Sequence, residues 1–312
     1  MPDQDLDHDN AYGGLIESGE SMEDHHWAFG TNFDDPLAGV AIETPAGVDG
    51  HDLAIYSLML ADDALIMSQR LAQWSTCAPE LEEELALANI GLDLLGQARL
   101  LLARAAAADA SVVPGLPAGS PVPSEDALAF FRDQTQFRNV RLTELENGDF
   151  ALSMFRLAVF SIWRLEMFKR LTESKDNVLA AVAVKGVKEM TYHRDYAARW
   201  CVTLARGTAE SRLRIERGIQ AIWPFVAELF FDNAIEQRMA QSGVGVVSAE
   251  LRSEFDLVVD QLVEAAELSS PRAKTATAIA GLAGRDGIHT EAMGALLAEL
   301  QSVARAHPCG RW

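Results

Sequence analysis

One stretch of the chain, residues 79–109, constrains the fold more than any other. It reads PELEEELALANIGLDLLGQARLLLARAAAAD, and apolar residues occur on nearly every side of the helix that it predicts. A helix of this kind is usually buried among other helices. Asn89, Asp93 and Gln97 nevertheless recur every four residues, which places them on one face. Because an unpaired buried polar group costs about 1–3 kcal/mol, this face needs a metal or other side chains as partners.

Helical periodicity also marks the segments on either side of long loops. Residues 51–75 predict a helix that precedes 79–109, and residues 149–174 and 176–206 predict a second pair. The connection within each pair is short, so we expect both pairs to be antiparallel. One long connection separates them, with four prolines between residues 111 and 123 and a short helix from Glu125 to Arg132.

The remaining third of the chain is also helical in pattern. Residues 209–241 predict a helix that Pro224 kinks or divides, followed by helices at 248–268 and 290–306 with a loop at 281–289. The pattern contains no convincing β alternation. The fold class is therefore all-α, and the order of the four long helices matches a ferritin-like four-helix bundle with additional C-terminal helices.

Charge and cysteine content limit the function classes. Residues 1–50 hold twelve of the 46 acidic residues and no Lys or Arg, so we interpret them as an acidic, flexible extension of a helical domain at 51–312. The net charge of −20 argues against nucleic-acid binding. No apolar run reaches the roughly 18 residues of a membrane span, and the first residues lack the basic-then-apolar pattern that predicts a secretory signal. Three dispersed cysteines are typical of a reduced, cytoplasmic protein.

The di-iron version of this bundle needs ligands that the chain does not supply in full. Two of its helices each provide a Glu, and the other two each provide Glu-x-x-His. Here Glu189 and His193 are four residues apart instead of three, and the helix at 79–109 has no His at all. The first helix supplies Asp62 and Asp63 as its carboxylates.

The third long helix, 149–174, offers a carboxylate in an unpromising place. Glu166 stands beside Arg164, Lys169 and Arg170, as on a solvated face, and Ser161 is the more inward candidate. We therefore favour a hydrogen-bonded network over a metal centre in the middle of the bundle. Its expected members are Asp62, Asn89, Asp93, Lys185, Glu189 and His193.

Lys185 tests this interpretation, because a cation in the bundle centre takes the place of a metal charge. If Lys185 is paired inside the network, Lys185→Met should lower stability by several kcal/mol. In a third interpretation, Lys185 and Lys188 lie on a solvent-exposed face, and the bundle centre then holds no polar site. The aromatic segment 219–231 is equally compatible with a partner-docking surface and with a core face.

Three segments carry a resemblance to a known family. PELEEELALANIGLDLLGQAR, VKEMTYHRDYAARW and GIHTEAMGALLAELQ resemble the non-catalytic structural subunits of bacterial phenylacetyl-CoA epoxidases, which act in aerobic phenylacetate breakdown. The similarity runs in matching order from about residue 51 to residue 312 and leaves out the acidic extension.

The resemblance implies a ferritin-like subunit without a di-iron centre and without catalytic or cofactor-binding residues of its own. It implies a homologous catalytic subunit that holds two irons and binds phenylacetyl-CoA, in a hetero-oligomer. A reductase component would pass electrons from NADPH, and the complex would form a ring-1,2-epoxide with O2. Two other hypotheses remain: a stand-alone metal-dependent oxidase that uses Asp62, Asp93, Glu189 and His193, and a helical binding protein unrelated to oxygenation.

Overall fold

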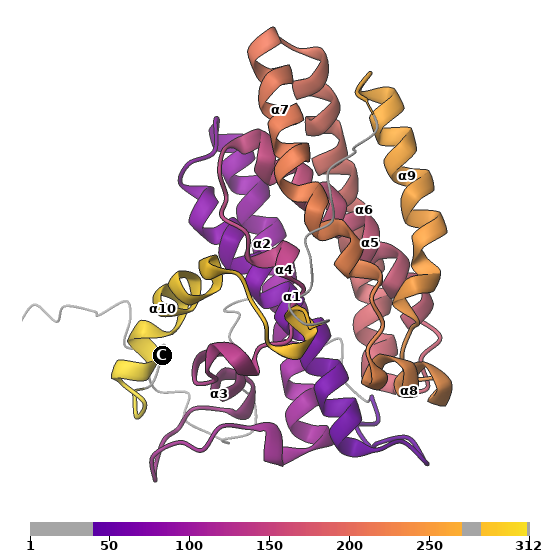
Figure 1. The fold of residues 1–312 in the computed structure, drawn as a ribbon. Helices are drawn as coiled ribbons and strands as arrows, with labels where there is room; N and C mark the ends of the chain where they lie inside the picture. The colour runs from indigo at the N-terminus through magenta and orange to yellow at the C-terminus, as the bar shows by residue number, and fades with distance from the viewer. Residues whose placement is uncertain (1–39, 270–281, 311–312) are drawn as a thin grey trace, which may run out of the picture. The chain divides into compact units, whose positions relative to one another are not determined.

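The computed structural model describes residues 40–269 and 282–310, and these residues form helices and loops (Figure 1). The first 39 residues of the predicted acidic extension lie outside the described part. Ten α-helices are present in the described residues, and the all-α prediction is confirmed.

Four long helices form the core, close to their predicted bounds. They are α1 (Gly50–Ser75), α2 (Leu81–Ala108), α5 (Phe150–Leu171) and α6 (Asn177–Arg206). Aspartates begin three of them, because the side chains of Asp49, Asp149 and Asp176 each accept a hydrogen bond from a backbone N–H in the first turn. The pairs α1–α2 and α5–α6 pack together, as in a ferritin-like bundle.

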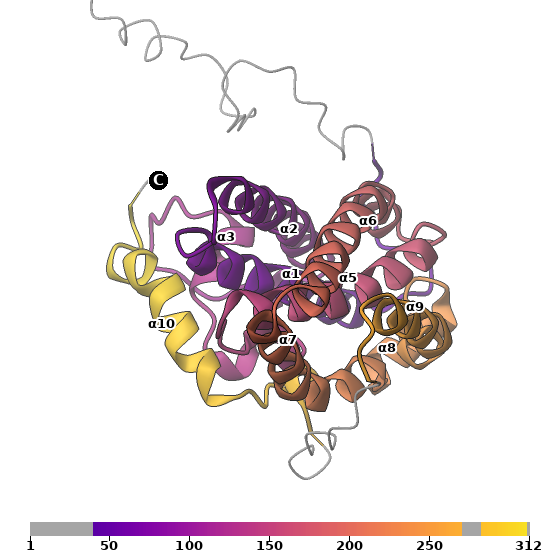
Figure 2. The same cartoon turned by 90° about the horizontal axis from the view of Figure 1, so that it is seen from above.

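The two pairs meet where α2 lies beside α6. Figure 2 shows both helices along one side, with α1 and α5 beneath them. Asp93 of α2 contacts His193 of α6, and Gln97 contacts Glu189, so the residue numbers run in opposite directions and the two helices are antiparallel. This seam carries most of the polar residues that the sequence placed in the bundle centre.

By length and composition alone, α2 is apolar enough to cross a membrane, although only 44% of its most apolar window is buried. The core helix of a bundle meets the same criteria, and α2 packs against α1, α3 (Ser124–Phe130) and α6. The low burial of so apolar a helix means that part of its apolar surface faces outward.

The connection between α2 and α5 and the segment after α6 pack against the four long helices. The connection contains α3 and one further turn of helix, α4 (Arg141–Glu144), which has too few residues to show a period. Pro224 divides the predicted helix 209–241 as expected: α7 (Ala209–Ile222) gives way to a 3-10 segment, Trp223–Phe230, and then α8 (Ala234–Ser242). The chain then forms α9 (Arg252–Ala265) and α10 (Glu291–Ala306), and α10 packs on α3 and α4.

Candidate functional site

A fully buried arginine occupies the middle of the four-helix bundle. Arg164 of α5 has no exposed surface. Its Nε donates a hydrogen bond to Gln97 Oε1 of α2 at 3.0 Å, and its Nη2 donates to the Leu60 carbonyl of α1 at 3.1 Å. The guanidinium carbon also lies 4.5 Å from the centre of the Phe168 ring, within cation–π range. Burial lowers the pKa of Arg164 to about 10, so the side chain still carries its charge at neutral pH.

Gln97 connects this arginine to the fourth helix. While its amide oxygen accepts from Arg164, its Nε2 donates to Glu189 Oε2 of α6 at 2.8 Å. Glu189 in turn faces Lys185 Nζ, 3.4 Å away and four residues earlier on α6. Groups from all four long helices are thus joined around one guanidinium. A polar network is present, but its central cation is Arg164 and not Lys185, and of the six expected members it contains Glu189 and Lys185.

Lys185 occupies the outer edge of this network. Its side chain is 42% exposed, and Glu189 on its own helix is its ion-pair partner. The expectation that Lys185 replaces a metal charge in the bundle centre is therefore wrong. The placement of Arg164 and Glu166 on a solvated face is also wrong, because both residues are buried. Glu166 pairs with Lys169 at 2.7 Å.

A second contact between α2 and α6 involves His193. This side chain is fully buried, and its Nε2 lies 3.0 Å from Asp93 Oδ2. Because a carboxylate only accepts at neutral pH, the proton of the imidazole resides on Nε2. Asp93 itself is 40% exposed. Two expected members of the network, Asp93 and His193, thus contact each other, whereas Asn89 is exposed on the outer side of α2.

The two aspartates of α1 lie apart from this network and serve another purpose. Asp62 is fully buried and accepts two hydrogen bonds from Arg132, at 2.5 and 3.0 Å, and one from the Arg138 backbone N–H. Asp63 is also fully buried, and its two carboxylate oxygens accept from Arg285 Nη1 and Nη2 at 3.0 and 2.8 Å. The expected place of Asp62 in a network with His193 is therefore corrected: it anchors the long connection to α1.

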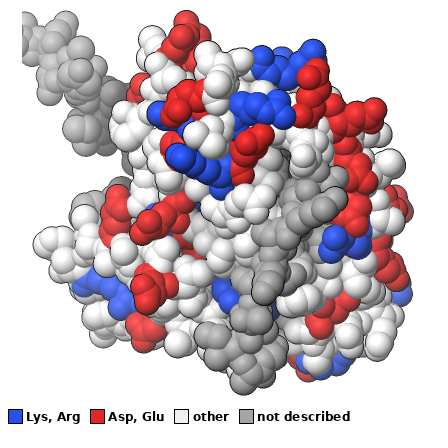
Figure 3. Space-filling model, turned by 45° about the horizontal axis from the view of Figure 1, so that its top comes forward, with Lys and Arg blue, Asp and Glu red and all other residues white. Residues whose placement is uncertain are grey.

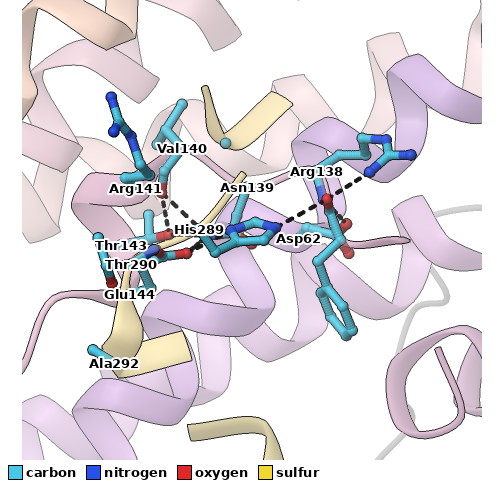
Figure 4. A network of polar contacts seen from close by, with 12 residues as sticks. Asp62, Arg138, Asn139, Val140, Arg141, Thr143, Glu144, His289, Thr290 and Ala292 are labelled. Carbon is cyan, nitrogen blue, oxygen red and sulfur yellow. Dashed lines mark hydrogen bonds and ion pairs between the residues drawn. The ribbon is translucent and has the colours of Figure 1, made fainter. Parts of the chain in front are cut away.

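The buried polar contacts near Asp62 continue to His289 and Thr290, which precede α10 (Figure 4). Glu144 of α4 accepts from His289 Nδ1 at 2.7 Å and from Asn139 Nδ2 at 2.9 Å, and its other oxygen accepts from the Thr290 backbone N–H. His289 Nε2 donates to the Phe137 carbonyl at 3.2 Å. Both ring nitrogens of His289 thus face hydrogen-bond acceptors, which fix the orientation of the ring.

A third buried ion pair completes the attachment of the C-terminal segment. Arg141 Nε donates to Glu228 Oε2 at 2.6 Å, and the other oxygen of Glu228 accepts from the backbone N–H groups of Arg141 and Gly284. Burial raises the pKa of Asp63, and it also raises the pKa of Glu236, whose Oε1 lies 3.9 Å from Arg285 Nε. These carboxylates are occupied by guanidinium and backbone donors, which makes them structural.

The bundle centre does not fit a pair of irons. Among the described residues, the acidic or His side chains close enough together to hold an ion are Glu80, Glu82 and Glu83, at the exposed start of α2. At the centre, a guanidinium meets one carboxylate through Gln97, and the one histidine of the seam is bound to a half-exposed aspartate. Neither arrangement provides the four carboxylates and two histidines of a di-iron site.

The sequence around Arg164 contains one signal that predicts its burial. Arg164 is four residues from both Phe160 and Phe168, so all three share the inward face of α5. No comparable signal marks Arg132 or Arg285, because each pairs with an aspartate 70 or 222 residues away in the chain.

Comparisons with known proteins identify the family of the chain. Residues 41–312 match the family described as phenylacetic acid catabolic protein. A relative from Escherichia coli strain K12, described as one of the subunits of 1,2-phenylacetyl-CoA epoxidase, is 39% identical over 262 residues, which cover 84% of this chain and 100% of the relative. A match over this much of the chain shows that it belongs to the phenylacetic acid catabolic protein family.

Proposed function

We propose that this chain is the non-catalytic structural subunit of a phenylacetyl-CoA 1,2-epoxidase in aerobic phenylacetate breakdown. The observation that carries the proposal is the Arg164 guanidinium in the middle of the bundle, bonded to α1 and α2 and linked through Gln97 to α6. The similarity to the epoxidase subunit from Escherichia coli supplies the reaction and the substrate class.

The charge of Arg164 opposes a metal at this place. At an effective dielectric constant of about 20, a divalent cation about 5 Å from the guanidinium would be disfavoured by about 7 kcal/mol. The protein cation instead satisfies Gln97 and the Leu60 carbonyl and attracts Glu189. We therefore propose that the subunit holds no cofactor, and that the di-iron centre belongs to a homologous catalytic partner.

In this proposal the chain acts through its partners. It packs against the catalytic subunit, supports it, and contributes to the surface on which a reductase component docks. Electrons from NADPH reach the irons of the partner, and phenylacetyl-CoA binds there. The proposal includes no nucleic-acid partner, because the net charge of the chain is −20. On the face drawn in Figure 3, Lys and Arg are interspersed with Asp and Glu. The free cysteines Cys77, Cys201 and Cys309 support a place in the reducing cytoplasm.

Reconstitution of the epoxidase tests the proposal. The chain and its catalytic subunit are expressed together, separated by size-exclusion chromatography, and assayed with the reductase, NADPH, O2 and phenylacetyl-CoA. We expect the two chains to elute together and epoxide formation to require both. The proposal fails if no complex forms, or if this chain with the reductase produces epoxide in the absence of the catalytic subunit.

A further inference from the structure

The outer side of α2 carries a stripe of exposed leucines. Leu92 is 60% exposed and Leu85 is 57% exposed, and Leu81 and Leu95 are exposed as well. Their spacings of four, seven and three residues place them on one face of the helix. Contiguous apolar surface of this kind on a soluble protein marks an interaction site.

The exposed side of α6 continues this surface. Leu92 immediately precedes the contact residue Asp93, and Tyr192 immediately precedes His193. A step of one residue turns about 100° around a helix, and in an antiparallel pair the same step on both helices leads to the same side. Tyr192, and Val184 two turns earlier, are therefore exposed on the same side of the seam as the leucines. We call this surface the α2–α6 face.

The exposed leucines of the α2–α6 face lie along the first half of α2. From Leu81 to Leu95 they extend over about 21 Å at 1.5 Å per residue. Two packed helices about 10 Å apart present a width of about 20 Å, so this apolar area covers roughly 400 Å². That is about half the share that each partner contributes to a protein–protein interface of standard size, so the partner also contacts surface beside the leucines.

A cavity adjoins the Leu81 end of the face. It has a volume of about 350 Å³ and is lined by Pro79, Phe150, Trp200 and Leu204 among others. The Phe150 and Trp200 rings meet edge to face with their centres 5.0 Å apart and form an aromatic part of the wall. Charged residues, among them Glu80 and Arg214, line the rest of it. Interfaces gain much of their affinity from a side chain seated in such a pocket.

We propose that the α2–α6 face is the surface on which the catalytic subunit docks. The inference rests on the function proposed above, which requires a second subunit of the epoxidase, and it identifies where that subunit binds. The partner would cover the leucine stripe and also the half-exposed side chains of Asp93 and Lys185, which open on the same seam. Glu80, Glu82 and Glu83 form an acidic rim at the start of α2, and they call for basic side chains on the partner.

Substitution of the exposed leucines tests this assignment. The double variant Leu85→Asp/Leu92→Asp changes surface residues only, so circular dichroism should show an unchanged helix content. We expect its dissociation constant for the separately purified catalytic subunit to rise by about 100-fold or more. Leu257→Asp on α9 is the matched control, because Leu257 is also 60% exposed but lies on another helix. It should change the dissociation constant by less than about threefold.

Cysteine labelling provides a second readout that does not depend on affinity. In the variant Leu92→Cys, the new cysteine should react with N-ethylmaleimide in the free chain and be protected in the complex. The native Cys309, which is exposed near the C-terminus, is the reference for labelling in both states.

Three results would overturn the assignment. If the wild-type chain binds the catalytic subunit and the double variant binds equally well, the face is wrong but the proposed function stands. If the wild-type chain does not bind the catalytic subunit, the proposed function fails with it. If the double aspartate variant abolishes self-association of this chain and leaves binding of the catalytic subunit intact, the face joins two copies of the chain instead.

Discussion

Replacing Asp63 by Asn tests whether the aspartates of α1 are structural anchors. Asn has the same shape as Asp and retains an oxygen for the Val140 backbone N–H, which donates to Asp63 Oδ1 at 2.9 Å. It removes the negative charge opposite Arg285, whose side chain is only 7% exposed. The substitution therefore isolates the cost of leaving one buried guanidinium without its main counter-charge.

We expect Asp63→Asn to lower the free energy of unfolding by about 3 kcal/mol. Breaking one side of a buried ion pair costs about 3–5 kcal/mol. The lower end applies here because Glu236 Oε1 lies 3.9 Å from Arg285 Nε and retains part of the attraction. With a urea dependence of about 3 kcal/mol per M, the unfolding midpoint should fall by about 1 M.

Glu210→Gln is the matched control in the same urea titration. Glu210 and Arg214 form an ion pair at 2.7 Å, as short as the buried one, but both side chains are more than half exposed. Its loss should leave the urea midpoint nearly unchanged, because solvent screens an exposed ion pair. Equal effects of the two substitutions would refute the argument that burial of Arg285 sets the cost.

Three further predictions concern the bundle and its buried acids. Lys185→Met should change the free energy of unfolding by less than about 1 kcal/mol in urea titration, since the side chain is 42% exposed; a loss of several kcal/mol would return Lys185 to the bundle centre. Gly186→Ala should lower the free energy of unfolding by about 1–3 kcal/mol, because the new Cβ would overlap the Phe168 ring. Gly96 has open space around it, so Gly96→Ala should stabilise the helix. Thermal unfolding that ranks the two variants the other way would contradict the packing. Burial raises the pKa of Glu236 in the folded chain. The free energy of unfolding should therefore fall as the pH rises from about 4.5, the ordinary pKa, through the raised pKa. Glu236→Gln should therefore gain stability relative to the wild type over this range in urea titrations at several pH values, and a constant difference would disprove it.

The helices were predictable because apolar residues recur at helical spacing, and the structure shows that their ends also carry local signals. Aspartates at positions 49, 149 and 176 accept from first-turn N–H groups, and Pro224 ends α7 as its ring requires. The single turn of α4 was missed because four residues show no period.

For the polar residues of α2 and α6, the helical pattern predicts which of them share a face but not how deeply each is buried. Residues four apart turn by 400°, so each step drifts 40° around the helix. Along α6 this drift takes Lys185 to the exposed edge and His193 to the buried one. Along α2 it turns Asn89 outward and Gln97 inward. A shared face was thus a correct prediction, but the two ends of each series lie in different surroundings.

The partners of the buried aspartates could not be predicted from the local sequence pattern. Asp62 and Asp63 are adjacent in sequence, yet one pairs with Arg132 before α4 and the other with Arg285 beyond α9. Tertiary packing decides these choices, and nothing in the segments around the two arginines differs from a solvated loop.

The iron content of the purified chain tests the central claim most directly. The chain is expressed alone in iron-supplemented cells, and iron is measured by mass spectrometry beside protein concentration. If Arg164 and its hydrogen-bond partners fill the bundle centre, the chain carries no stoichiometric iron, and iron appears only when the catalytic subunit is present. One or two irons per chain, lost in His193→Ala, would contradict the account.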